Sequence, residues 1–270
     1  MTIDAPSLTE DNDALARDYD RVSATRQLEG GKQLVAELGL QKGERVLDVG
    51  CGTGLLAEHI AGLVGPEGQV LGIDPLPLRI ELAQARARPG LRYQVGDAYA
   101  LDGLPAEGFD AIVLNAVFHW LPEKSGPLRS FARLLRKGGR LAISTGLKGH
   151  RGRVYEAMGA AMAEPPFDRY ARPAHALTMR VDADEMRALL EEAGFEPLLL
   201  EVRDSDQLHP SPEAAVRFSE ASSFGNLFAH LPEEVRPAAR KHLAERLGRL
   251  MTPQGLVNPR RRLIAVARRR

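Results

Sequence analysis

Residues 45–54, with the sequence RVLDVGCGTG, place three glycines at alternate positions directly after a short apolar run. The apolar run predicts a strand over 45–49, and the spacing of apolar residues in 55–64 predicts a helix just after the glycines. A glycine loop between a strand and a helix leaves bare backbone at the helix N-terminus, where a ligand can approach closely. The segment therefore predicts an α/β chain with a ligand site at the carboxyl edge of its sheet.

The rest of the chain repeats this alternation of strand and helix patterns. Further strands are predicted over 70–73, 91–95, 109–114, 140–145, 195–202 and 261–269, and further helices over 78–87, 126–136, 154–163 and 182–194. Repeated strand–helix units imply a parallel sheet with helices on both faces. Residues 212–250 predict two or three additional helices, interrupted at Gly225 and Pro232.

Composition limits the classes of partner and compartment. The 270 residues carry 36 Lys and Arg against 36 Asp and Glu, so the overall charge gives no long-range attraction to nucleic acid or an anionic membrane. Cys51 is the single cysteine, which excludes an internal disulfide and a cysteine-rich metal cage. The polar, acidic start lacks a secretion signal, and no apolar run reaches membrane-spanning length. We expect a cytoplasmic protein with no membrane partner and no metal.

Acidic residues accompany the glycine loop and indicate what it binds. Asp48 precedes the first glycine by two residues, whereas dinucleotide-binding loops use the spacing G-x-G-x-x-G around a pyrophosphate. A carboxylate here suits a cationic or amino-bearing ligand. Asp74 stands twenty residues after Gly54 at the end of the next predicted strand, where it can accept hydrogen bonds from ribose hydroxyls.

These motifs, in this order, resemble class I S-adenosylmethionine-dependent methyltransferases. The resemblance covers VLDVGCGTG at 46–54, GIDP at 72–75, VGDA at 95–98, FDAIVLNAVFHWLP at 109–122 and LLRKGGRLAIS at 134–144. It implies a doubly wound, Rossmann-like, mostly parallel seven-stranded sheet with the last strand antiparallel, plus helical lid insertions. It also implies S-adenosylmethionine as the cofactor and S-adenosylhomocysteine as the product.

The resemblance assigns cofactor contacts to residues across these motifs. Asp48 would help to hold the glycine loop and the ammonium group, Asp74 the ribose, Asp97 the adenine amino group, and Ala98 would add a backbone contact. Asn115 would face the methyl group and act in catalysis. The implied cofactor-binding residues are Tyr19, Gln27, Asp48, Gly50, Cys51, Gly52, Gly54, Asp74, Pro75, Asp97, Ala98 and Asn115.

The two ends of the chain are similar to the trans-aconitate methyltransferase group of small-molecule enzymes. The similarity lies in 19–40, NAVFHWLP, GLKGH and the segment from SPEAAVRF onwards. It implies an N-terminal helical cap over 1–37, a cofactor-binding core over 38–204 with 260–270, and a helical insertion over 205–259 that forms part of the substrate lid. Tyr19 and Gln27 would then cover the cofactor.

The expected reaction is methyl transfer to a carboxylate or hydroxyl oxygen of a small molecule, by a monomer or homodimer. A carboxylate is ionised and needs cations to orient it, which Arg260 to Arg262 could supply, and we single out Arg261 as substrate-binding. A hydroxyl needs a base, and His119 is the candidate catalytic residue, with Trp120 beside it as a substrate wall. An aromatic pair at this position is as often part of the core.

Two other functions stay open at the level of sequence. Six arginines in the last eleven residues could serve an RNA or other nucleic-acid methyltransferase. Against that, residues 115–118 read NAVF in place of the N-P-P-Y type of motif used for base amines. A protein that binds S-adenosylmethionine without transferring the methyl group would keep the same glycine loop.

Overall fold

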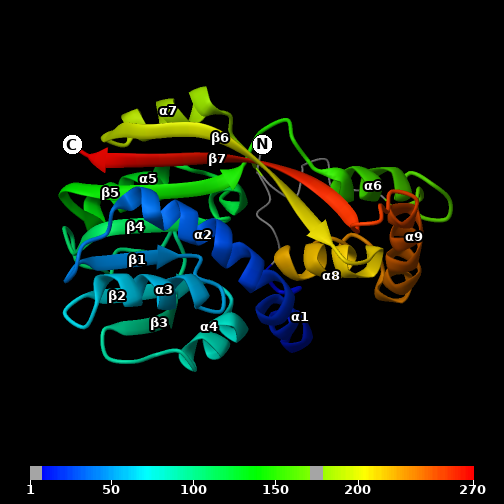
Figure 1. Ribbon diagram of the computed structural model, residues 1–270, viewed down its shortest axis with the longest axis horizontal. Coiled ribbons are helices and arrows are strands. Elements are labelled where there is room, and N and C mark those ends of the chain that lie inside the picture. The colour runs from blue at the N-terminus through cyan, green and yellow to red at the C-terminus, as the bar shows by residue number, and fades with distance from the viewer. Residues whose placement is uncertain (1–7, 171–178) are drawn as a thin grey trace.

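The computed structural model describes residues 8–170 and 179–270, apart from the side chains of residues 23–25. Within this part of the chain, one sheet has the strand order β3-β2-β1-β4-β5-β7-β6 (Figure 1). The strands are β1 Arg45–Val49, β2 Gln69–Asp74, β3 Leu91–Val95, β4 Phe109–Asn115, β5 Leu135–Gly146, β6 Phe195–His209 and β7 Leu256–Arg269. The strands β1 to β5 pair in parallel, and β7 runs antiparallel to both of its neighbours. The fold class expected from the sequence is confirmed.

Helices cover both faces of the sheet and extend beyond its carboxyl edge. They are α1 Asp13–Asp18, the π-helix η1 Tyr19–Ala24, α2 Thr25–Leu38, α3 Leu55–Val64, α4 Pro77–Gln84, the 3-10 helix η2 Phe118–Trp120, α5 Ser125–Leu134, α6 Arg153–Ala161, α7 Ala183–Glu192, α8 Pro212–Ser222, the 3-10 helix η3 Glu233–Val235 and α9 Arg236–Gly248. None of the described helices is long and apolar enough to cross a membrane.

The sheet has a buried core on each side. Val46 packs with Leu34 of α2 and Ile60 of α3, whereas its neighbour Leu47 packs with Phe131 of α5. Successive side chains of a strand point to opposite faces, so a strand covered on both faces needs a continuous apolar run. This requirement explains why the central strands were predictable from apolar runs alone.

The last two strands are longer than the sequence predicts. Beyond the predicted end at residue 202, β6 continues to His209, paired with β7 in register from Arg203↔Arg262 to His209↔Leu256. The added stretch of β6, RDSDQLH, is mostly polar because here the two strands leave the sheet as a ribbon (Figure 1). Residues 204–206 of β6 are exposed, so this stretch lacks the apolar pattern by which strands are recognised.

The ribbon ends in a group of helices that stands away from the sheet (Figure 1). The helices α6, α8 and α9 share a separate apolar core that includes Met158, Phe228 and Leu243. α8 also packs against α1 and η1 at the N-terminal end of the chain. These elements lie beyond the carboxyl ends of the parallel strands, where ligands of doubly wound sheets bind.

Candidate functional site

The glycine loop after β1 is fixed to the end of β2. The backbone amides of Gly50 and Cys51 both donate to the carbonyl oxygen of Ile73, at 2.7 and 2.9 Å. Gly50 has a φ of +72°, and a Cβ atom there would lie 2.3 Å from Cγ2 of Val117. Only glycine combines this backbone conformation with this close approach. The loop therefore presents bare backbone towards the turn that follows β4.

Two buried carboxylates stand behind the loop. Asp74 accepts from the amide of Gly52 through Oδ2 at 2.9 Å and from the amide of Leu76 through Oδ1 at 3.0 Å. Oδ2 of Asp48 and Oγ1 of Thr53 are buried with no hydrogen-bond partner. Burial, and then the charge of Asp74, raise the pKa of Asp48 to about 7. A buried acceptor of this kind is suited to a cationic donor from a ligand.

A cavity of about 930 Å³, counted with its open mouth, lies over these groups. Its walls include Tyr19, Gln27, Gly50, Gly52, Asp74, Pro75, Asp97, Ala98 and Asn115, and an adjoining pocket adds Asp48 and Cys51. The structure thus brings together every predicted cofactor residue except Gly54. Gly54 precedes α3 with a φ of +89°, and a Cβ atom on it would lie 2.7 Å from the ring of Tyr93. Its position requires glycine for helix–strand packing.

Tyr19 forms the roof of this cavity at the loop. Its ring lies so close to Gly52 that a Cβ atom there would be 3.0 Å from the ring. The guanidinium carbon of Arg79 lies 4.0 Å from the centre of the same ring. Burial raises the pKa of Tyr19 to about 12, so the phenol stays protonated. Tyr19 is therefore a fixed, uncharged cover.

A second cavity, of about 760 Å³ with its opening, adjoins the first. The two share wall residues Gln27, Ala116, Trp120 and Ser222. Ala116 follows β4 with a φ of +62°, a conformation that alanine rarely adopts and that costs on the order of 1 kcal/mol. The strained turn follows Asn115, which lines the first cavity, and precedes Trp120, which lines both. His119 lines the second cavity.

The second cavity is rich in cations. Arg151, Arg180, Arg260, Arg261 and Arg262 contribute to its walls, and no carboxylate does among the described residues that line it. Two of these side chains bind neutral acceptors. Arg260 donates to Oε1 of Gln207 at 2.9 Å, and Arg262 donates to Oδ1 of Asn115 at 3.0 Å. Burial lowers the pKa of both arginines, and the charge of Arg260 lowers that of Arg262 further.

Arg261 differs from its two neighbours in the strand. Its side chain is half exposed and donates to Asp204 at 2.8 Å, because alternate residues of β7 point to opposite faces. Arg261 was predicted from the sequence, whereas Arg180 and Tyr155, which also line the cavity, come from segments without a recognisable motif. The alternation of side chains along a strand predicts that Arg260 and Arg262 share one face of β7. The assignment of Arg261 to the acceptor stays a prediction.

His119 lies against the cations as a neutral ring. Its Nδ1 is 3.1 Å from Oγ1 of Thr145. Burial, followed by the charges of Arg180 and Arg262, holds the pKa of His119 well below its usual range. The ring of Trp120 lies 5.1 Å from that of His119, so the two aromatic groups form one continuous wall.

Asn115 connects the two cavities by hydrogen bonds. Its Nδ2 donates to the carbonyl oxygen of Gln27 at 3.0 Å, while its Oδ1 accepts from Arg262. The chain of α2 can approach this closely because residue 31 is glycine. A Cβ atom on Gly31 would lie 3.0 Å from Nδ2 of Asn115 and 2.9 Å from both methyl groups of Leu56.

Replacing Gly31 with alanine should displace Asn115 and weaken its bond to Gln27. We expect turnover to fall by about tenfold, since misplacing a positioning group costs ten- to a hundredfold, while the gain in helix propensity of about 1 kcal/mol keeps the fold intact. Initial rates and a thermal melt would check this. Gly62, on α3 with open space around its Cβ position, provides the control as Gly62→Ala. Equal rates for both variants would contradict the prediction.

Comparison with known proteins agrees with this geometry. Residues 19–200 match the methyltransferase domain family. The aklanonic acid methyltransferase DauC from Streptomyces sp. is 37% identical over 142 residues, which are 51% of this chain and 64% of DauC. The ubiquinone/menaquinone biosynthesis C-methyltransferase UbiE from Citrobacter koseri is 28% identical over 174 residues, covering 58% of this chain and 68% of UbiE. The match thus spans less than two thirds of DauC.

Solved structures share the fold. The YcgJ protein from Bacillus subtilis superposes with a TM-score of 0.60 at 17% identity, covering 91% of this chain and 99% of YcgJ. At this identity the likeness concerns the fold alone. With the family match over residues 19–200, the sheet order and the glycine-lined cavity, the chain belongs to the class I S-adenosylmethionine-dependent methyltransferase domains, with S-adenosylmethionine as cofactor.

Proposed function

We propose that this protein transfers the methyl group of S-adenosylmethionine to a carboxylate oxygen of a small-molecule acid. The observation that carries the proposal is the second cavity, which holds several arginines and no carboxylate among the described residues of its wall, directly beside the cofactor cavity. Buried guanidinium groups with neutral partners such as Gln207 and Asn115 retain their charge for an anionic ligand.

The residues around the glycine loop fit the cofactor. Oδ2 of Asp48 and Oγ1 of Thr53, both without a partner, would accept from the ammonium group and bind the amino-acid portion. Asp74 keeps lone pairs for the ribose hydroxyls after accepting two amides. The bound cofactor supplies a methyl group already activated by its sulfonium. The protein therefore has to align the acceptor and exclude water.

The second cavity suits an acceptor that needs no deprotonation. Arg262 would hold the carboxylate, and Asn115 would keep Arg262 in place through its Oδ1. His119 would act as a neutral wall and hydrogen-bonding group, because a histidine with a strongly lowered pKa is a weak base. This lowered pKa disfavours a hydroxyl acceptor that depends on His119 for activation. The cap over 1–37 and the insertion over 205–259 would close the site through Tyr19 and Ser222.

The relatives support a small acceptor. One is named for an acid, aklanonic acid, and the other for C-methylation in quinone biosynthesis. The narrower similarity to the trans-aconitate methyltransferase group remains part of the proposal, and the acid-binding cavity is what supports it.

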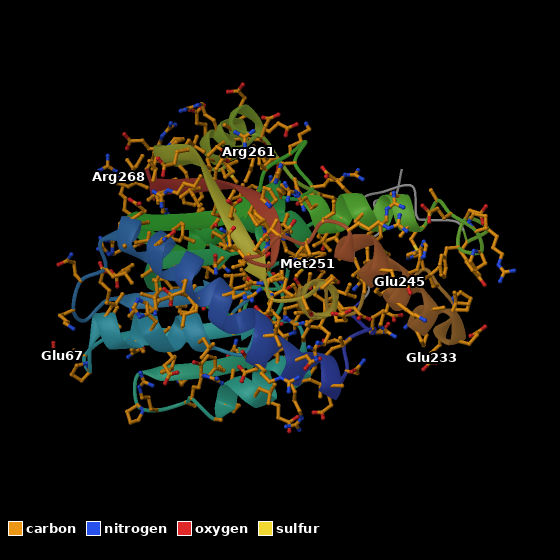
Figure 2. All side chains as sticks on the ribbon, turned by 45° about the vertical axis from the view of Figure 1, so that its right-hand side comes forward. Glu67, Glu233, Glu245, Met251, Arg261 and Arg268 are labelled. Atoms are coloured by element: carbon orange, nitrogen blue, oxygen red, sulfur yellow. The ribbon has the colours of Figure 1, made fainter. Side chains whose placement is uncertain are left out.

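The arginines of the C-terminus give less support to a nucleic-acid acceptor. Arg268 pairs with Glu196 at 2.7 Å, and Arg269 pairs with Glu107 at 3.1 Å. Arg261 and Arg268 are labelled in Figure 2, and both are half exposed beside acidic partners. Side chains already paired with carboxylates form a poor surface for phosphates.

Calorimetry with S-adenosylhomocysteine, followed by a methyl-transfer screen, tests the function. The screen should contain small carboxylic acids, their amides, phenols, amines and RNA. We expect binding of the nucleoside and turnover on an acid, with a base-labile methyl ester as product. Turnover confined to a phenol, a carbon nucleophile or RNA would replace the acceptor. Failure to bind S-adenosylhomocysteine would overturn the proposal as a whole.

The pKa of Asp48 predicts a pH dependence of cofactor affinity. In the free protein this pKa is raised to about 7, and a ligand ammonium beside the carboxylate would lower it, so binding below pH 7 releases a proton. Affinity for S-adenosylhomocysteine should therefore rise roughly tenfold from pH 5 to pH 6 and less than about twofold above pH 7. Calorimetry across this range measures the slope. Asp48→Asn should flatten it, and a flat profile in the unmodified protein would refute the role of Asp48.

A further inference from the structure

Arg79 of α4 is a buried arginine that contacts three other parts of the chain. Its Nε and Nη2 lie 3.4 and 3.5 Å from the two carboxylate oxygens of Asp11, and the two side chains are only 5% and 3% exposed. Nη2 also donates to the carbonyl oxygen of Ala221 at 2.9 Å. The guanidinium stacks on the ring of Tyr19, as described above. One core side chain thus joins the segment before α1, the π-helix η1 and the end of α8.

The burial of Arg79 together with Asp11 points to a role in fixing geometry more than in stability. Removing two charges from water costs about as much as their attraction returns, so a buried ion pair adds little stability compared with apolar packing. Ala221 lies in the last turn of α8, and its carbonyl oxygen also accepts from the amide of Phe224 at 3.2 Å. The guanidinium of Arg79 is a further donor to this oxygen, and a cation at the C-terminal end of a helix interacts favourably with the helix dipole. The contacts of Arg79 therefore hold α8 in one place.

The end of α8 that Arg79 holds belongs to both cavities. Ser222 lines the cofactor cavity and the acceptor cavity, and Phe224 lines the first. Phe224 has a φ of +41°, a conformation that a bulky residue adopts only when its surroundings impose it. Its ring lies 4.8 Å from that of Trp120, which also faces both cavities.

We propose that Arg79 is a positioning residue that couples occupancy of the cofactor cavity to the placement of α8 over the acceptor cavity. Arg79 itself lines the cofactor cavity, together with Tyr19 and Asp74. A nucleoside in that cavity contacts the same cover that Arg79 holds, so it restrains Tyr19 and, through Arg79, the end of α8. The acceptor then meets a completed wall of Trp120 and Ser222. This inference rests on the proposed binding of S-adenosylmethionine.

Hydrogen exchange with and without S-adenosylhomocysteine tests the coupling in the full chain. In the unmodified protein, we expect the nucleoside to slow amide exchange about tenfold both in the glycine loop, residues 50–54, and at the end of α8, residues 219–226. In Arg79→Met, the glycine loop should still be protected, the end of α8 should not, and affinity should fall about tenfold. Arg88→Met removes an exposed arginine paired with Glu58 and should behave like the unmodified protein.

The possible outcomes distinguish failure of the proposed coupling from failure of the proposed function. If the unmodified protein binds S-adenosylhomocysteine but exchange at 219–226 is unchanged, the coupling is wrong and the function stands. If Arg79→Met retains both the affinity and the protection of α8, Arg79 is not the link. If the unmodified protein does not bind the nucleoside, both proposals fall. Should Arg79→Met fail to fold in a thermal melt, Arg79→Lys keeps the charge but lacks the planar group that stacks on Tyr19 while it donates to Ala221, and wild-type protection of residues 219–226 in that variant would overturn the proposal.

Discussion

Replacing Asp74 with alanine is expected to weaken the binding of S-adenosylhomocysteine by about a hundredfold. The buried carboxylate fixes the glycine loop through the amide of Gly52 and the following turn through the amide of Leu76. Hydrogen bonds to a charged group contribute about 1.5–3 kcal/mol each, and about 1.4 kcal/mol corresponds to a factor of ten in affinity. Asp74→Ala would remove both the bonds that fix the loop and the contacts to the ribose, so affinity should fall by more than the loss of one neutral hydrogen bond would cause.

Calorimetry of Asp74→Ala and Asp102→Ala would measure this effect against a matched control. The side chain of Asp102 is 99% exposed and lies 3.9 Å from Arg133, so its removal should leave affinity within about twofold. Asp74→Asn keeps the shape but exchanges one acceptor oxygen for a donor, and it should fall between the two. Wild-type affinity in Asp74→Ala would withdraw the assignment of ribose to this carboxylate.

Substituting Arg262 with glutamine should lower kcat/KM for the acid acceptor by about a hundredfold, mainly through KM. A carboxylate that loses a buried, hydrogen-bonded cation loses about 2–5 kcal/mol of binding. Lysine should not restore activity, because Nη2 of Arg262 already contacts Asn115 and Ser144, and a single ammonium group cannot keep these contacts and bind a carboxylate in the planar, bidentate way of a guanidinium. Affinity for S-adenosylhomocysteine should change little.

Arg261→Gln is the matched control, one residue away in the same strand. Its guanidinium pairs with Asp204 and is half exposed, so we expect less than about a threefold change in kcat/KM. The pair of variants also tests the sequence-based assignment of the acceptor to Arg261. A large effect in Arg261→Gln with none in Arg262→Gln would place the acceptor carboxylate on the other side of the strand.

The sequence best predicts those positions at which the local backbone requires one residue type. Gly50 and Asp74 were predictable because a strand, a tight loop and a helix follow each other within a few residues, and no distant contact is needed to place them. The central strands were predictable because both faces are buried. The structure adds a capping box at the start of α7, in which Asp182 and Glu185 each accept from the other's backbone amide.

The second cavity, which we propose as the acceptor site, depends on contacts between distant segments. Arg180 precedes α7, Tyr155 belongs to α6, and Arg260 lies on β7, yet all three line one cavity. No motif within these three segments predicts that they come together, because their contact results from the ribbon and from the packing of the outer helices. Gly54 shows the reverse case, in which a motif residue serves packing against Tyr93 instead of the cavity wall.

The ribbon formed by the ends of β6 and β7 has a consequence for how such enzymes diversify. Its hydrogen bonds continue in register to His209↔Leu256, and α8 and α9, which lie between those two residues, share a separate core with α6. A different helical segment grafted between 209 and 256 would therefore leave the sheet ladder and the glycine loop in place, and it would replace the part of the cavity wall that Ser222 and Phe224 form. Arg260 and Arg262, at the base of the ribbon, would stay in place. If the second cavity is the acceptor site, exchange of this segment would change the shape of the site above an unchanged pair of arginines.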